Sequence, residues 1–171
     1  VLILTLPSAY ENYKGYFAYF RSQGAQLSDP YFKAMQFLSS ERNYKDTVLE
    51  IPDKNISATK RDLMSWYGWS SPAIVAFGNK RGYLNNEYID FAGVDIAPRI
   101  DFVRKIILLN KMFTSNALEY TDLQKEVKRG LKEYKISFIY SPYPLSALDA
   151  ISNVDKVFEN QVATIYKVDV K

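Results

Sequence analysis

The sequence predicts an α/β fold: a single three-layer domain over residues 1–171, with a mixed sheet and a C-terminal β-hairpin. Helix-like and strand-like segments alternate along the chain, which is typical of helices packed against a sheet. Two short runs rich in β-branched residues then close the sequence. The chain is 47% apolar and 24% charged, and 171 residues suffice for one domain with a hydrophobic core.

The first helix–strand unit follows a lead-in, residues 1–27, whose aromatic residues fit neither the helical nor the strand period. We expect this lead-in to be irregular and to follow a membrane span; its start, 1–6, is either a strand or a stub of that span. Residues 29–41 are predicted to be a helix with Pro30 in its first turn. The helix has one apolar face, formed by Tyr31, Ala34, Met35 and Leu38. A strand is expected at 47–51.

The middle of the chain, residues 53–96, has the weakest pattern. The segment SSPAIVAF at 70–77 fits either a helix or a buried strand, because a run this short does not distinguish them. Residues 78–86 are expected to be loop, since glycine and asparagine recur there.

Two further helices are predicted in the second half. Residues 98–113 carry two adjoining apolar stripes and should be well buried. Residues 122–134 have one apolar face, and Thr121 with Gln124 form a capping box at its start. Gly130 lies inside this helix at a cost of about 1 kcal/mol relative to Ala, which tertiary packing can offset.

The end of the chain is predicted to supply most of the sheet. The strand 136–140 should be central, because its Ile and Phe side chains leave little polar face. A short helix, LSALDAI, precedes strands 155–159 and 162–169, which pair as a hairpin around Asn160-Gln161.

Charge and missing residue types narrow the possible functions. The net charge of +3 comes from 22 basic and 19 acidic residues. The basic pairs are Lys60-Arg61, Lys80-Arg81, Arg104-Lys105 and Lys128-Arg129. They are scattered among acids as solvated surface groups, whereas a nucleic-acid binder concentrates them, so no nucleic-acid partner is expected. The absence of Cys and His excludes thiolate nucleophiles, Ser-His-Asp triads and Cys or His metal sites. We expect no cofactor, no metal and no catalytic residue.

The candidate binding residues are Trp66, Tyr67 and Trp69, in the stretch LMSWYGWSSP. Flat aromatic rings stack on the apolar faces of sugars while nearby hydroxyl groups bind the sugar hydroxyls, so this stretch suits a glycan. The alternative is a buried aromatic cluster beside a turn at Gly68. We expect Trp66 to be mostly buried and Trp69 to be partly exposed.

Acidic residues offer a second, weaker candidate site. Carboxylates cluster in the sequence at Glu87, Asp90, Asp95 and Asp101. A converging pair would suit glycoside hydrolysis, but scattered loop acids are usually solvated. The sequence Asn55-Ile56-Ser57 is an N-glycosylation sequon, which fits an extracytoplasmic location.

Two segments resemble a known class of proteins. The stretch LKEYKISFIYSPYP at 131–144, followed by KVFENQVATIYKV at 156–168, resembles the C-terminal soluble domain of polytopic GT-C glycosyltransferase-like membrane proteins. The stretch YFKAMQFLSSERNYKDTVLEIP at 31–52 is similar, more loosely, to the helix and strand that follow the last membrane span of such proteins. The resemblance covers about 31–52 and 131–170.

The resemblance implies a non-catalytic, extracytoplasmic accessory domain that is tethered to the cell membrane. Such a domain would contact the membrane-embedded portion of the same polypeptide. It would also contact a glycan or a partner protein. In that class the catalytic acids lie in loops between membrane helices. Two alternatives remain from the residues themselves. One is a free-standing, carboxylate-dependent hydrolase or transferase. The other is a protein-binding module that uses Val162–Val168 as an unpaired sheet edge.

Overall fold

The computed structural model describes residues 29–41, 43, 45–69, 74, 78–84, 96–113 and 118–169. The expectations for the lead-in 1–27, and for all of 70–77 except Ile74, fall outside the described residues.

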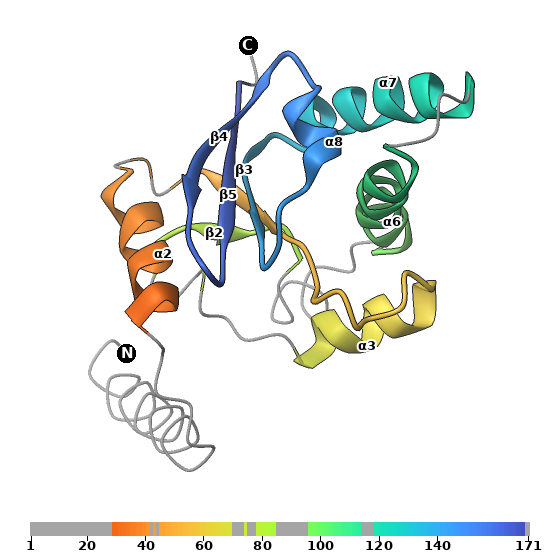
Figure 1. Cartoon of the computed structure of the whole chain (residues 1–171). Coiled ribbons are helices and arrows are strands. Elements are labelled where there is room, and N and C mark those ends of the chain that lie inside the picture. The colour runs from red at the N-terminus through yellow and green to blue at the C-terminus, as the bar shows by residue number, and fades with distance from the viewer. Residues whose placement is uncertain are drawn as a thin grey trace, which may run out of the picture.

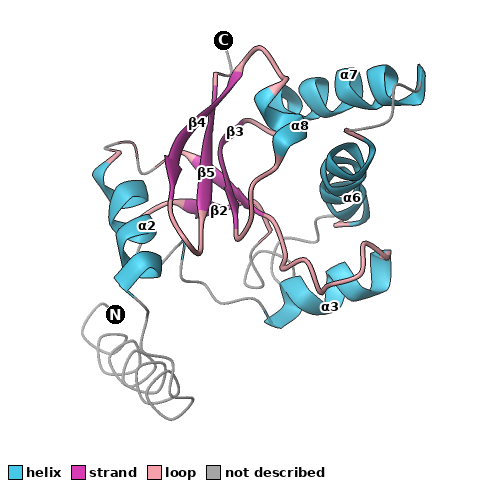
Figure 2. Cartoon of the chain, viewed as in Figure 1, coloured by secondary structure: helices cyan, strands magenta, loops and turns pink. Residues whose placement is uncertain are grey.

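The sheet is mixed, as predicted, and ends in a C-terminal hairpin (Figures 1 and 2). Its strands are β1 (Thr47–Glu50), β2 (Arg81–Gly82), β3 (Ile136–Ser141), β4 (Val154–Glu159) and β5 (Thr164–Val168), in the order β2-β1-β3-β5-β4. Strand β1 runs parallel to β2 and β3, whereas β5 runs antiparallel to β3 and β4. The α/β fold class is therefore confirmed.

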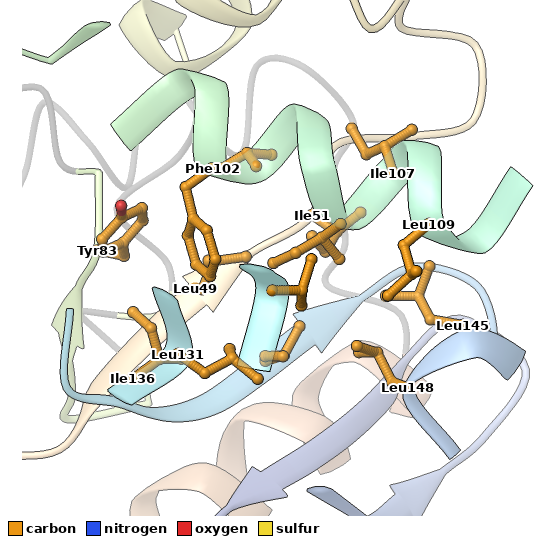
Figure 3. Close-up of a cluster of buried hydrophobic side chains, with 14 of the residues drawn as sticks. Leu49, Ile51, Tyr83, Phe102, Ile107, Leu109, Leu131, Ile136, Leu145 and Leu148 are labelled. Carbon is orange, nitrogen blue, oxygen red and sulfur yellow. The ribbon is translucent and has the colours of Figure 1, made fainter. Parts of the chain in front are cut away.

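Helices cover both faces of the sheet and complete three layers (Figure 1). Helix α2 (Asp29–Ser40) lies on one face. The other face carries α3 (Lys60–Trp69), α6 (Ala97–Met112), α7 (Leu118–Glu133) and α8 (Ser146–Asp149). The core is accordingly divided into two clusters of buried side chains, an α2-side cluster and a larger cluster beneath the other helices (Figure 3).

The central position of β3 is confirmed, and a β-bulge explains its apolar sequence. Thr47 of β1 pairs with Ile136, but the next residue, Val48, pairs with Phe138, so Ser137 is the extra residue. Because of this shift, Ile136 packs in the larger cluster and Phe138 packs in the α2-side cluster. The strand therefore buries apolar side chains on both faces.

Gly130 allows α7 to pack closely on α6. A Cβ atom at this position would lie 2.6 Å from Cδ2 and 3.0 Å from Cζ of Phe102, closer than real carbon contacts. The Phe102 ring thus occupies the space that a side chain at 130 would need. Tertiary packing offsets the helix-propensity cost of this glycine, as expected from the sequence.

The side chain of Asn160 stabilises the turn of the hairpin between β4 and β5. Oδ1 of Asn160 accepts hydrogen bonds from the backbone N–H groups of Val162 (3.0 Å) and Ala163 (2.9 Å), and its Nδ2 donates to the carbonyl of Pro30 (2.6 Å).

Strand β5 lies between β3 and β4, so the expectation that Val162–Val168 is an unpaired edge was wrong. The physical reason is composition: β5 is almost fully buried, whereas the charged strand β4 forms the edge.

Three local expectations also need correction. Helix α7 begins at Leu118, so Thr121 lies inside it and forms no capping box; the amide of Gln124 instead donates to the Ala150 carbonyl at 3.2 Å. The sequence pattern missed helix α3. Residues 81–82, expected in a loop, form β2, which hydrogen bonds to β1.

Lys80 is buried rather than solvated, contrary to the interpretation of its basic pair. Its ammonium group donates to the carbonyls of Glu41 and Asn43 and lies 3.7 Å from the Asp46 carboxylate. These acceptors replace the water that a lysine normally binds. Lys80 therefore fixes the connection between α2 and β1 to the start of β2.

Candidate functional site

The candidate site lies at the carboxyl ends of the parallel strands β1 and β3. In α/β sheets, ligands bind most often in the region outside these strand ends. Helix α3 packs here through Tyr67, a residue 2% exposed, whose hydroxyl donates a hydrogen bond to the backbone carbonyl of Glu50, the last residue of β1. The predicted aromatic stretch is thus anchored directly to the sheet.

Trp66 and Tyr67 are brought together, in different roles. Their ring centroids are 4.7 Å apart with an interplanar angle of 83°, an edge-to-face contact. Tyr67 is buried, and its burial raises the pKa of its hydroxyl well above the ordinary value. Trp66 is only partly buried and packs against the larger core cluster. Tyr67 is therefore a support, and Trp66 offers the accessible surface. The side chain of Trp69 lies outside the described residues.

Tyr143, just after β3, is a second partly exposed aromatic residue beside this cluster. The Ser141 hydroxyl donates to the Tyr143 carbonyl at 2.6 Å and accepts from its N–H at 3.3 Å, which fixes the turn. Lys54 Nζ lies 4.9 Å from the ring centroid of Tyr143. Burial, and to a lesser degree the Asp53 carboxylate, raise the pKa of the Tyr143 hydroxyl. Tyr67, whose ring contacts Trp66, also lies near enough to Tyr143 for the Tyr143 hydroxyl to raise its pKa. We therefore group Trp66 and Tyr143, on either side of Tyr67, as the aromatic platform.

Sequence reasoning missed Tyr143, Lys54 and Asp53 as site residues. Each follows a strand end, in the connections after β1 and β3, and only the parallel pairing of these strands brings them to one edge. The recurrence of aromatic and charged residues immediately after two predicted strands was the available signal. The stretch LMSWYGWSSP also supplies three serine hydroxyls that could bind a sugar: Ser65 is exposed on α3, and Ser70 and Ser71 lie outside the described residues.

Glu50, the last residue of β1, carries a buried carboxyl group that sequence reasoning also missed. Burial raises the pKa of its carboxyl group to about 8. Its neighbour across the strand ladder is Tyr140, and the carboxylate in turn raises the pKa values of Tyr31 and Tyr140, after the larger effect of burial. The signal was a charged residue at an inward position of an apolar strand.

The acidic residues singled out in the sequence do not form a site in the described part of the chain. Asp101 binds Arg104 at 3.0 Å on a half-exposed surface of α6, and Glu87, Asp90 and Asp95 lie outside the described residues. Arg99 donates to the Tyr83 carbonyl at 2.7 Å. Among the described residues, no group of three or more acidic, His or Cys side chains is placed to hold a metal ion.

A groove of about 300 Å³ lies between α6 and α7. Phe102, Gly130 and Tyr134 line it, together with charged residues of both helices. Lys105 and Glu126, which both line it, form an ion pair at 2.6 Å, and Lys105 lowers the pKa of Glu126. Because such charges satisfy each other, the aromatic platform is the stronger candidate for binding.

Asn55 of the predicted sequon is exposed in the turn between β1 and α3. Across the described residues, every helix is too short or too polar to cross a lipid bilayer. Comparisons of the chain with protein-family models, with curated proteins and with solved structures found no match.

Proposed function

We propose that this chain is a non-catalytic, extracytoplasmic accessory domain of a membrane glycosyltransferase-like protein, and that it binds a glycan at the aromatic platform. The observation that carries the proposal is the arrangement of Trp66 on Tyr67. A partly exposed indole is held edge-to-face on a buried ring, whose hydroxyl is bonded to the end of β1.

The chemistry of the platform suits a sugar. Indole and phenol faces pack against the C–H groups of a pyranose ring, and charged or polar groups at the rim bind its hydroxyls. The ammonium of Lys54 and the carboxylate of Asp53 stand beside Tyr143 and supply a donor and an acceptor. Because Ser141 fixes the backbone at Tyr143, and the anchored Tyr67 ring contacts Trp66, part of the ordering that binding requires is already present in the free protein.

The membrane-tethered part of the proposal rests on the resemblance described above. The segments that carry it fold as α2 with β1, and as the end of α7 with β3, α8, β4 and β5. They therefore supply every described strand except the two-residue β2. The exposed turn at Asn55 is compatible with an extracytoplasmic surface. The membrane-embedded portion of the same polypeptide is the partner that this proposal requires.

Tryptophan fluorescence tests the glycan site. In a Trp69→Phe variant, Trp66 is the sole tryptophan, so a saturable quench or shift on titration with an oligosaccharide panel reports on the platform. Tyr143→Ala in the same background should weaken binding about tenfold, as loss of an aromatic stacking partner does. Phe32→Ala, which removes a ring 44% exposed on α2 across the sheet, is the matched control and should leave affinity unchanged.

Two results would overturn the glycan site: no response to any oligosaccharide, or equal affinities for Tyr143→Ala and its parent. The membrane tether has a separate test. The coding sequence upstream of Val1 should contain multiple hydrophobic spans, and protease added outside sealed cells should digest this domain in the full-length protein. Protection of the domain from protease, as for a cytoplasmic domain, would refute the extracytoplasmic, membrane-tethered part of the proposal. The glycan site would then be judged by the sugar titration alone.

A further inference from the structure

The carboxyl group of Glu50 lies on the opposite face of the sheet from the aromatic platform. Glu50 pairs with Tyr140 in the β1–β3 ladder, so the two side chains share one face. Tyr140 belongs to the α2-side cluster, whereas Leu49 and Ile51, on either side of Glu50, pack in the larger cluster. The carboxyl group therefore points between the sheet and α2.

Two aromatic rings flank this carboxyl group. Tyr31 of α2 meets Tyr140 edge-to-face, with ring centroids 6.2 Å apart. Glu50 raises the pKa of both hydroxyls, which places all three groups in one electrostatic neighbourhood. Tyr140 is buried, whereas Glu50 and Tyr31 are each partly exposed as whole residues, so this cluster lies at the margin of the α2-side core.

The carboxylate lacks a counter-cation in the described part of the chain, where no hydrogen bond or ion pair reaches its oxygens. Three titratable side chains are coupled electrostatically to Glu50: Tyr31 of α2 and Tyr140 of β3 on its own face of the sheet, and Tyr67 of α3 on the other face. All three are neutral phenols at pH 7. Burial without a cation holds the carboxyl group protonated, with a pKa of about 8. A single bound cation would therefore stabilise the ionised form of the Glu50 carboxyl group.

Cation–ring contacts occur elsewhere on the face of the sheet that α2 covers. Phe138, two residues before Tyr140 on β3, has Lys80 Nζ at 5.8 Å and Lys167 Nζ at 5.7 Å from its ring centroid. Both cations also have oxygen partners, in Glu41 and in the loop before β1. At the Glu50 end, the rings and the carboxylate are present and the cation is the missing component among the described residues.

We propose that Glu50, Tyr31 and Tyr140 form a binding site for a small organic ammonium ion, with the carboxylate neutralising its charge and the aromatic rings contacting its alkyl groups. Rings beside a carboxylate are the usual recognition set for alkylated ammonium groups. When the cation binds, the O–H bond of the Glu50 carboxyl group breaks and the proton leaves to solvent, so the charge of the complex equals that of the free protein. The site goes beyond glycan binding and does not depend on it.

Calorimetry with choline and its uncharged isostere 3,3-dimethylbutan-1-ol tests the site. Choline should bind saturably and the alcohol should not. With a pKa of about 8, about nine-tenths of Glu50 is protonated at pH 7, so about 0.9 proton should be released per choline bound. Titrations in phosphate and in Tris measure this release, because the two buffers absorb protons with different enthalpies. Affinity should rise about tenfold from pH 7 to pH 9, since choline itself does not titrate.

Variants separate the carboxylate from the rings. Glu50→Gln mimics the protonated side chain, so it should fold normally at pH 7 and lose choline binding and proton release. Tyr31→Leu should weaken binding several-fold, whereas Tyr31→Phe should retain it, because the ring face and not the hydroxyl contacts the ligand. Glu159→Gln, on the edge strand β4, is the control and should bind as the parent does.

Each contrary result overturns the proposal: equal binding of choline and the alcohol, retention of binding by Glu50→Gln, or choline binding without proton release. Failure of choline to bind at pH 9, where the carboxylate is ionised, would also overturn it. The fluorescence response of Trp66 to sugars should persist in a folded Glu50→Gln protein, so failure of this site leaves the glycan proposal intact and distinguishable.

Discussion

Replacing Gly130 with alanine should destabilise the protein, although alanine is the better helix former. In an open helix the change would contribute about 1 kcal/mol of stability. Here the new Cβ would lie 2.6 Å from Cδ2 of Phe102, and overpacking of this kind costs about 1–3 kcal/mol. Several ring atoms are within 3.0 Å of the added carbon, so the cost falls at or above the upper end of that range. We expect a net loss of about 2 kcal/mol or more.

Urea denaturation of a double-mutant cycle isolates the contact. Phe102→Val removes the ring atoms that oppose the added methyl group, so Gly130→Ala should become neutral or stabilising in that background. The cycle cancels the separate cost of truncating Phe102 and reports only the coupling between the two positions. If Gly130→Ala stabilised the parent protein, or if its effect were the same in both backgrounds, α7 would not pack on the Phe102 ring.

Two further predictions concern the α2-side cluster. Phe138→Ala should cost about 3–5 kcal/mol, because the ring is buried in the central strand; a loss below about 1 kcal/mol in denaturant melts would mean that it is not core. Burial raises the pKa of Glu50 from 4.5 to about 8, so the folded state holds this proton more tightly than the unfolded state. Stability should therefore fall as pH rises from about 4.5 to about 8, by up to about 1.4 kcal/mol per pH unit, and then level off. Glu50→Gln should remove this slope, and identical melting curves across that range would contradict the assignment.

The elements that the sequence predicted well have patterns that are complete within a short stretch. The helix 29–41 has its proline in the first turn and a continuous apolar stripe, and α2 differs from it by one residue. The strand 136–140 has little polar face, which favours a position inside the sheet. Such elements form where local pattern and tertiary burial favour the same structure.

The missed elements depend on partners that are distant in sequence. Strand β2 has only Arg81 and Gly82, and it is a strand because neighbouring residues bond to β1: the N–H of Tyr83 donates to the Val48 carbonyl at 2.8 Å. Helix α3 buries Leu63 and Tyr67, one turn apart, while exposed polar residues and Gly68 obscure the stripe. Neither pattern is interpretable before the fold is known.

The same distinction applies to the candidate site. Trp66 and Tyr67 were found because aromatic residues cluster in the sequence, but the hydrogen bond from Tyr67 to the end of β1 is tertiary. Tyr143 was missed because its proximity to α3 arises from the parallel pairing of β1 and β3. The sequence pattern therefore identified Trp66, whereas Tyr143 could be recognised as part of the platform only from the strand pairing.

Glu50 differs from these residues because its unusual position could be recognised from the sequence: a charged residue stands where the strand pattern calls for an apolar one. In the strand TVLE, Val48 faces α2, and the period of two places Glu50 on that same inward face. A carboxyl group there loses water, and it is tolerated because it stays protonated beside two tyrosine rings. An apolar residue would satisfy the packing without any change of pKa. Since local rules are most often broken at functional positions, this inward carboxyl group is the residue where a functional requirement most directly accounts for the sequence.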